Sequence, residues 1–219
     1  MRSKSVFRHL SIILMLPVLL AAQSTYHLQR ATLFELLPGD TTDIVFLGNS
    51  ITDGGNWSEL FNRLEVKNRG ISGDISSGVL ARLDPILVHQ PDKIFLMIGV
   101  NDLAAGIETP DIVANYDSII QRVKAESPRT RLYLQSVLPV NPDIGEKFKN
   151  HTDKNAEVSQ LNWHLRRLAR VNDLEYIDLW SEFIDVDGRL DSAVTNDGLH
   201  LTGPGYLRWR DLILEQVNE

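Results

Sequence analysis

The chain has 219 residues, with 29 acidic and 22 basic side chains, a formal charge of −7 and no cysteine. This length suits one α/β domain with a sizeable core. The acidic balance argues against nucleic acid or an anionic membrane as a partner, and the lack of cysteine excludes disulfides, thiolate metal sites and acyl-cysteine lipid anchors.

Residues 1–24 have the pattern of a secretory signal peptide. Arg2, Lys4 and Arg8 form a basic start, residues 10–20 are mainly apolar, and small residues follow. The apolar run is shorter than a membrane span needs, although an uncleaved N-terminal anchor is the alternative. Without these 24 residues the chain keeps 19 basic and 29 acidic side chains, a formal charge of about −10. We expect an exported bacterial protein, periplasmic or secreted, with no stable membrane association after cleavage.

Residues 25–219 alternate between two kinds of pattern. Short apolar or β-branched runs predict strands, and apolar residues at helical spacing predict helices. In chain order the first half predicts a helix or arm at 26–38, a strand at 43–47, a helix at 57–64, a strand at 66–71, a helix at 79–87 that Pro85 breaks or bends, and a strand at 93–98. The second half predicts a helix at 110–126, a strand at 131–137, a helix at 155–171, a strand at 175–178 and a helix at 205–217.

The alternation determines the expected fold class. About five strands separated by helices call for a parallel sheet with helices on both faces. No linker or shift in composition divides residues 25–219, so we expect one domain. The segment 138–153 has no predicted strand or helix, and such long loops are often functional.

Ser50 is the first candidate for chemistry. It follows the apolar run 44–47, and Gly48 allows a sharp exit from that strand. Open α/β sheets bind their ligands at the carboxyl ends of the strands, which is where this serine stands. The alternative is a turn serine that caps the next helix.

Three predicted strands end in glycine-bearing loops, at residues 48–50, 70–73 and 99–102. In a parallel sheet these loops lie side by side at one edge. Acyl transfer needs a hydroxyl that attacks a carbonyl and fixed N–H donors for the oxygen that becomes negative. The backbone N–H groups of Ser50 and Gly73 and the amide of Asn101 could supply that oxyanion hole.

A serine nucleophile needs a base, and His200 is the strongest candidate. It lies in a glycine-containing loop after the last predicted strand, with Asp197 three positions before it. A turn there brings the carboxylate to one ring nitrogen while the other faces Ser50, which fixes the tautomer. The alternative is that Asp197 caps the last helix and His200 is a surface residue. The other five histidines lie in the N-terminal segment or in helical or surface contexts: His9, His27, His89, His151 and His164.

Four blocks of the chain, in order, resemble the SGNH hydrolases, which are the GDSL-type esterase and lipase family. The blocks are Gly-Asn-Ser-Ile-Thr at 48–52, Arg-Gly-Ile-Ser-Gly-Asp at 69–74, Gly-Val-Asn-Asp at 99–102 and Asp-Gly-Leu-His at 197–200. The resemblance implies a flavodoxin-like three-layer α/β/α fold with a roughly five-stranded parallel sheet. It also implies hydrolysis of esters without a metal or other cofactor.

The same resemblance assigns roles within those blocks. It makes Ser50, Asp197 and His200 a catalytic triad, and it makes Gly73 and Asn101 donors of the oxyanion hole beside Ser50. The chain departs from the family pattern at Asn49, where the family name has aspartate, but asparagine can also organise a turn by hydrogen bonding. Position 52 is threonine, so the nucleophile does not lie in the G-x-S-x-G elbow of α/β-hydrolases.

The second and third blocks resemble most closely the platelet-activating-factor-acetylhydrolase-like branch and bacterial carbohydrate acetylesterases. This implies a short acyl group, acetyl in the first place, on a small-molecule or glycan ester. The alternatives are a lysophospholipase or thioesterase with a longer apolar groove, or a glycan-binding protein without catalysis. Trp57 and residues 138–153 could line such a pocket or could serve packing and surface. The sequence leaves the oligomeric state open.

A metal site is the remaining alternative for the acids at the strand ends. Asp74, Asp102, Asp197 and His200 could lie near one another, but no second ligand follows Asp74 or Asp102 at a metal-binding spacing. Acids at strand ends more often cap loops or helices, so we reject a metal site.

Overall fold

The computed structural model describes residues 24–219, so the predicted signal peptide, apart from Ser24, lies outside the described residues. A five-stranded sheet forms the centre of this part, in the order β2-β1-β3-β4-β5, and each neighbouring pair is parallel. The strands are β1 Ile44–Gly48, β2 Val66–Gly70, β3 Lys93–Met97, β4 Arg131–Gln135 and β5 Glu175–Ile177. The predicted parallel α/β fold and its five strands are confirmed.

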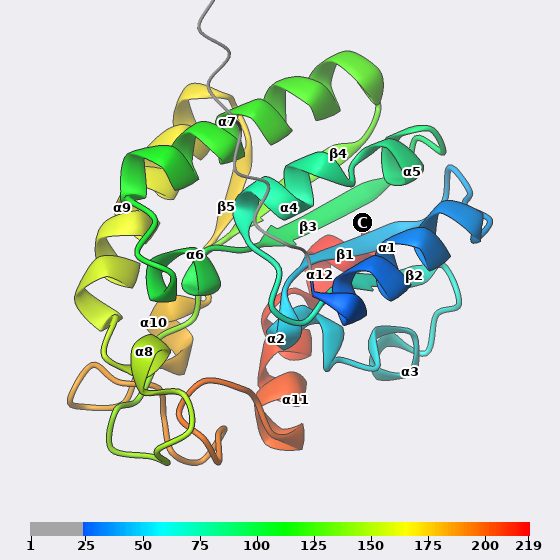
Figure 1. Cartoon of the computed structure of the whole chain (residues 1–219). Coiled ribbons are helices and arrows are strands. Elements are labelled where there is room, and N and C mark those ends of the chain that lie inside the picture. The colour runs from blue at the N-terminus through cyan, green and yellow to red at the C-terminus, as the bar shows by residue number, and fades with distance from the viewer. Residues whose placement is uncertain (1–23) are drawn as a thin grey trace, which may run out of the picture.

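Helices cover both faces of this sheet (Figure 1). On one face α4 contacts α7 and α7 contacts α9, and on the other α11 contacts both α3 and α12. The helices from the first half of the chain are α1 Thr25–Leu36, α2 Ser50–Asp53, α3 Trp57–Phe61, α4 Ser76–Ala81, α5 Asp84–Leu87 and α6 Val100–Ala104. Those from the second half are α7 Thr109–Glu126, α8 Lys149–Thr152, α9 Asn155–Val171, α10 Trp180–Phe183, α11 Gly203–Leu212 and α12 Leu214–Asn218.

Several predicted boundaries were wrong for local reasons. The helix predicted at 79–87 is broken, as expected from Pro85, but its first part begins earlier, at Ser76. Pro85 sits in the first turn of α5, where its missing N–H costs nothing. The helix predicted at 57–64 ends at Phe61, because Asn62 takes the left-handed conformation that terminates helices. The closing helix is divided into α11 and α12 at Ile213, and the segment 138–153 contains α8.

A stack of aromatic rings joins the sheet to α3 and α11. Phe46 of β1 lies 4.0 Å from Trp57 and 5.0 Å from Phe95 between ring centroids, and Trp57 meets Trp209 edge-on at 4.8 Å. The Trp57 side chain is 1% exposed and its indole N–H donates to the Thr52 carbonyl at 2.8 Å. Trp57 therefore serves packing and does not line a substrate pocket.

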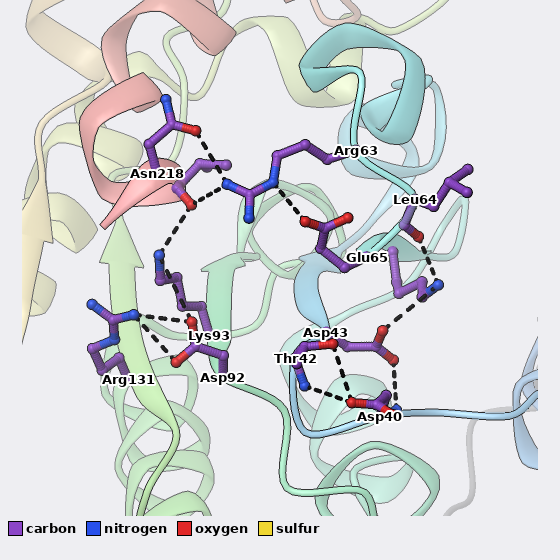
Figure 2. A network of polar contacts seen from close by, with 12 residues as sticks. Asp40, Thr42, Asp43, Arg63, Leu64, Glu65, Asp92, Lys93, Arg131 and Asn218 are labelled. Atoms are coloured by element: carbon purple, nitrogen blue, oxygen red, sulfur yellow. Dashed lines mark hydrogen bonds and ion pairs between the residues drawn. The ribbon is translucent and has the colours of Figure 1, made fainter.

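The amino ends of the strands are tied to the end of the chain by the network in Figure 2. Lys93 Nζ donates to the Val217 carbonyl at 3.0 Å, and Arg63 Nη1 donates to the same carbonyl at 3.1 Å. Burial is the main cause that lowers the pKa of Lys93. Because structural contacts occupy the amino ends of the strands, we expect a functional site at the opposite edge of the sheet, at the carboxyl ends of the strands.

Candidate active site

Ser50 is the first residue of α2, directly beyond the carboxyl end of β1. The preceding Asn49 caps this helix, because its Oδ1 accepts a hydrogen bond from the Ile51 N–H at 3.1 Å. Asparagine thus performs the turn-forming contact that an aspartate could make at the same position. The result is a partly exposed hydroxyl fixed at the edge of the sheet.

His200 lies between Ser50 and Asp197. Its Nε2 is 3.0 Å from Ser50 Oγ and its Nδ1 is 2.8 Å from Asp197 Oδ2. Because a carboxylate can only accept, Nδ1 carries the proton and Nε2 is left to accept from the serine hydroxyl. The structure therefore brings together the three residues that the sequence proposed as nucleophile, base and orienting acid.

Asp197 holds the loop as well as the ring. Its Oδ1 accepts from the backbone N–H groups of His200, at 2.8 Å, and Leu199, at 3.0 Å. Burial works to raise the pKa of Asp197, but the hydrogen bonds from His200 and Leu199 outweigh it, and the net pKa is lowered. The carboxylate is consequently ionised at neutral pH, as a group that stabilises an imidazolium must be.

The loop that carries Gly73 is anchored on both sides. Before it, the Ser72 hydroxyl donates to Asp53 Oδ2 of α2 at 2.7 Å, and after it the Asp74 carbonyl accepts from Asn101 Nδ2 at 2.8 Å. Gly73 itself has φ +82°, a left-handed conformation that favours glycine. The backbone N–H groups of Ser50 and Gly73 have no hydrogen-bond acceptor among residues 24–219. Both are therefore available to a ligand.

Asn101 is in a helix, whereas the sequence predicted a loop for residues 99–102. Gly99 has φ +136°, which lets the chain turn from β3 into α6 over only two residues. The Asn101 side chain is consequently held by a rigid element next to the Gly73 loop. Its Oδ1 also meets His151 Nε2 of α8 at 3.1 Å.

Behind the Gly73 loop, a buried ion pair connects two strand ends. Arg82 Nε donates to Asp74 Oδ2 at 2.7 Å, and Arg82 Nη2 donates to the Gly48 carbonyl at 3.0 Å. His27 of α1 approaches the second Asp74 oxygen at 3.2 Å. Burial lowers the pKa of Arg82, and the charge of Asp74 opposes that shift. The network fixes the Gly73 loop relative to the end of β1.

Asp102 also has a structural partner. Both carboxylate oxygens accept from the Ser76 N–H at 3.0 Å, and Oδ1 accepts from the Ser76 hydroxyl as well. Complete burial raises the pKa of Asp102 to about 6. Asp74 and Asp102 are thus turned to Arg82 and Ser76, and residues 24–219 contain no cluster of three or more acidic, histidine or cysteine side chains suited to a metal ion.

Residues 138–153, which the sequence suggested could line a pocket, contact the site, although no individual side chain among them was predicted to do so. The Phe148 ring packs edge-on against His200 with centroids 4.9 Å apart, and against His151 at 6.0 Å. The Asn141 N–H donates to the Gly198 carbonyl at 2.8 Å, which ties this segment to the loop that carries Asp197 and His200. The only sequence signal was the unusual length of the loop, because nothing local distinguishes His151 from the other histidines.

A serine, an imidazole and a carboxylate in series at the carboxyl edge of a parallel sheet is the arrangement of a serine hydrolase. The model of the GDSL-like lipase/acylhydrolase family matches residues 46–208, and the chain belongs to that family. It is accordingly an ester hydrolase. In the part of the chain that the structure describes, no helix is both long and apolar enough to span a membrane.

Known proteins of several organisms are similar to the chain. The alpha2 subunit of rat (Rattus norvegicus) platelet-activating factor acetylhydrolase IB is 30% identical over 188 residues, which are 81% of this chain and 78% of the relative. A structure from Streptococcus pneumonia, provisionally described as a platelet activating factor, is 28% identical with a TM-score of 0.79, covering 88% of this chain and 92% of that one. Axe2, an acetylxylan esterase from Geobacillus stearothermophilus, is 18% identical with a TM-score of 0.66, covering 83% and 96%, and shares the fold.

Proposed function

We propose that the protein is a serine esterase that removes short acyl groups, acetyl in the first place, from small-molecule or carbohydrate esters. The observation that carries this proposal is the series Ser50–His200–Asp197, with hydrogen-bond distances of 3.0 and 2.8 Å. The partly exposed Ser50 hydroxyl supports acyl transfer at this edge, as do the backbone N–H groups of Ser50 and Gly73, which have no acceptor within residues 24–219.

In the proposed reaction Ser50 Oγ attacks the ester carbonyl and His200 Nε2 takes the hydroxyl proton. Asp197 stabilises the imidazolium that results. The carbonyl oxygen becomes negative and meets the N–H groups of Ser50 and Gly73 and the amide of Asn101. The imidazolium then gives its proton to the leaving alcohol, and an acyl group remains on Ser50. A water molecule, deprotonated by His200 Nε2, attacks this acyl group. The bond to Ser50 Oγ breaks, the imidazolium returns the proton to Oγ, and the carboxylic acid leaves.

The acyl preference is supported by relatives rather than by the geometry alone. The rat relative is named an acetylhydrolase, and at 30% identity the chain can be expected to act on the same short acyl group. The alcohol part is less constrained. The name platelet-activating factor points to a lipid-derived ester, so a lipolytic enzyme is the second candidate.

The place of action is also a proposal. We infer that the protein is exported and that residues 1–24 are removed, on the basis of the basic and apolar pattern of that segment. Helix α1 begins at Thr25, directly after it. Mass spectrometry of the protein recovered from periplasm and medium tests both points, and a full-length chain in the cytoplasm would contradict them.

Hydrolysis of p-nitrophenyl esters from acetate to decanoate, by the protein and by Ser50→Ala, tests the activity. A rate highest for acetate and reduced about 10³- to 10⁶-fold in Ser50→Ala is expected, since triad members act as a unit. A maximum at long chains would favour the lipolytic candidate. No Ser50-dependent turnover on any ester would favour a glycan-binding protein without catalysis. EDTA should leave the rate unchanged, and a loss restored by a divalent metal would contradict this mechanism.

A further inference from the structure

Both ends of the Asn101 amide are held by hydrogen bonds. Its Nδ2 donates to the Asp74 carbonyl at 2.8 Å, and its Oδ1 lies 3.1 Å from His151 Nε2. The two partners come from different parts of the molecule, the loop after β2 and helix α8. The family motifs predicted the asparagine, but they gave no reason to connect it with this histidine.

The contacts determine the protonation of the histidine. A backbone carbonyl can only accept, so the Asn101 nitrogen must face Asp74 and the Asn101 oxygen must face His151. That oxygen can also only accept, so His151 Nε2 must carry a proton. Burial, followed by the nearby His200, lowers the pKa of His151 and favours a neutral ring. A neutral ring has a single N–H, and here it points at Asn101.

We propose that His151 is a positioning residue that fixes the orientation of the Asn101 amide and so makes Asn101 an effective oxyanion donor. This inference rests on the proposed ester hydrolysis. One Nδ2 hydrogen of Asn101 is used by the Asp74 carbonyl, and the other is left for substrate. Rotation of the amide by half a turn would present an oxygen to the negative charge of the transition state. His151 opposes that rotation because it offers a donor to Oδ1 alone.

The surroundings of His151 hold its ring in place. Phe148 packs edge-on against it, and the Nδ1 atom is buried without a hydrogen-bond partner among residues 24–219. A ring flip would exchange Nε2 with Cε1, so that a carbon in place of the N–H donor would face Asn101 Oδ1. The ring therefore has one favourable orientation, which is the one that donates to Asn101.

Two substitutions of His151 separate the hydrogen bond from the packing. His151→Leu removes the donor, and His151→Gln can place an amide N–H near the position of Nε2. We expect His151→Leu to lower kcat roughly 5- to 100-fold with KM changed less than about twofold, because an acceptor is left unsatisfied. His151→Gln should recover most of that loss. His164→Leu, on α9 beside Trp163, is the matched control and should keep the rate.

A double-mutant cycle with Asn101→Ala is the decisive experiment. If His151 acts through Asn101, His151→Leu should cost less than about twofold more in the Asn101→Ala background. Full additivity of the two losses would overturn the proposal and indicate that His151 acts through Phe148 and His200. A change confined to KM would also overturn it, since that result indicates contact with substrate.

A measurement on the unmodified protein tests the proposal even if the variants fail to fold. Long-range ¹H–¹⁵N spectra of the histidine rings should show His151 neutral, with its proton on Nε2, in the unmodified protein. A proton on Nδ1 would contradict the proposal. Absence of Ser50-dependent turnover would contradict the proposed function, whereas a Ser50-dependent enzyme with additive losses would contradict only the role of His151.

Discussion

His200 Nε2 lies 3.0 Å from Ser50 Oγ, although 150 positions separate the two residues in the chain. Ser50 follows β1 near the middle of the sheet, and His200 belongs to the irregular segment after α10. That segment is stiffened by a bridge between Thr195 and Leu201 and by the bond from the Gly198 N–H to Thr195 Oγ1 at 3.0 Å. The imidazole is therefore delivered to the serine by a rigid turn.

The carboxylate of Asp197 should matter chiefly through the tautomer of His200. Asp197→Asn can present an N–H to Nδ1, which would move the ring proton to Nε2 and leave no acceptor for Ser50. We expect kcat to fall by about 10⁴, with the fold intact by circular dichroism. Asp187→Asn, an exposed position in the same segment, is the control and should keep the rate. A loss below tenfold would argue against a triad.

Gly198 makes the close contact between the loop that carries Asp197 and His200 and residues 138–153. It has φ +79°, and an added Cβ would lie 2.2 Å from the Asn141 carbonyl oxygen, which is backbone and cannot easily move. Gly188 has φ +73° with nothing within 4 Å of an added Cβ, so Gly188→Ala introduces backbone strain without a steric clash.

We therefore expect Gly188→Ala to lower the free energy of unfolding by about 1–2 kcal/mol. Gly198→Ala should cost more than Gly188→Ala and should also reduce kcat, because Asp197 and His200 move with the loop. Urea denaturation and ester hydrolysis of the two variants measure both effects. Equal losses of stability with unchanged kcat would contradict the importance of this contact.

Asp102 should make stability depend on pH. Its pKa is raised to about 6 by burial, so between about pH 4 and 6 the folded protein binds a proton that the unfolded chain has released. The contribution of Asp102 to the free energy of unfolding is fully present below the pKa that this group has in the unfolded chain. It is lost as the pH rises through 6, and the loss amounts to about 3 kcal/mol.

The variant Asp102→Asn isolates this effect, because all other groups titrate alike in both proteins. From pH 4 to 7.5 the difference in free energy of unfolding should shift by about 2–3 kcal/mol in favour of the variant. Asp117→Asn on the exposed face of α7 should show no such shift. A pH-independent difference for Asp102→Asn would mean that Asp102 is ionised throughout.

Arg82 should be critical for folding because it is the main partner of a buried carboxylate. Arg82→Met leaves Asp74 charged and poorly compensated, and we expect a loss of about 3–5 kcal/mol in the free energy of unfolding. Arg131→Met is the control, since the Arg131–Asp92 pair is 41% exposed on both sides and should contribute less than about 1 kcal/mol. Thermal or urea denaturation compares the two. Similar losses would show that the buried network is not the stabilising element we describe.

The sequence by itself determined the strands and the residues at their ends. Strands buried on both faces are near-continuous apolar runs, and β1 and β3 are buried along their lengths with Lys93 as the one charged residue. Glycines mark where such strands turn, so the sequence alone assigns Ser50, Gly73 and Asn101 to one edge of the sheet. Asp197 and His200 could be paired because a turn of three residues is a local feature.

Only the tertiary structure decided which side chains support those residues. Whether residues 99–102 form a loop or a helix depended on the packing of α6, and propensity over so few residues does not settle it. The contact of His151 with Asn101 joins residues 50 positions apart, and Arg82 reaches Gly48 across 34. Such contacts leave no periodic trace in the sequence, because they depend on where the folded elements meet and not on the pattern within any one of them.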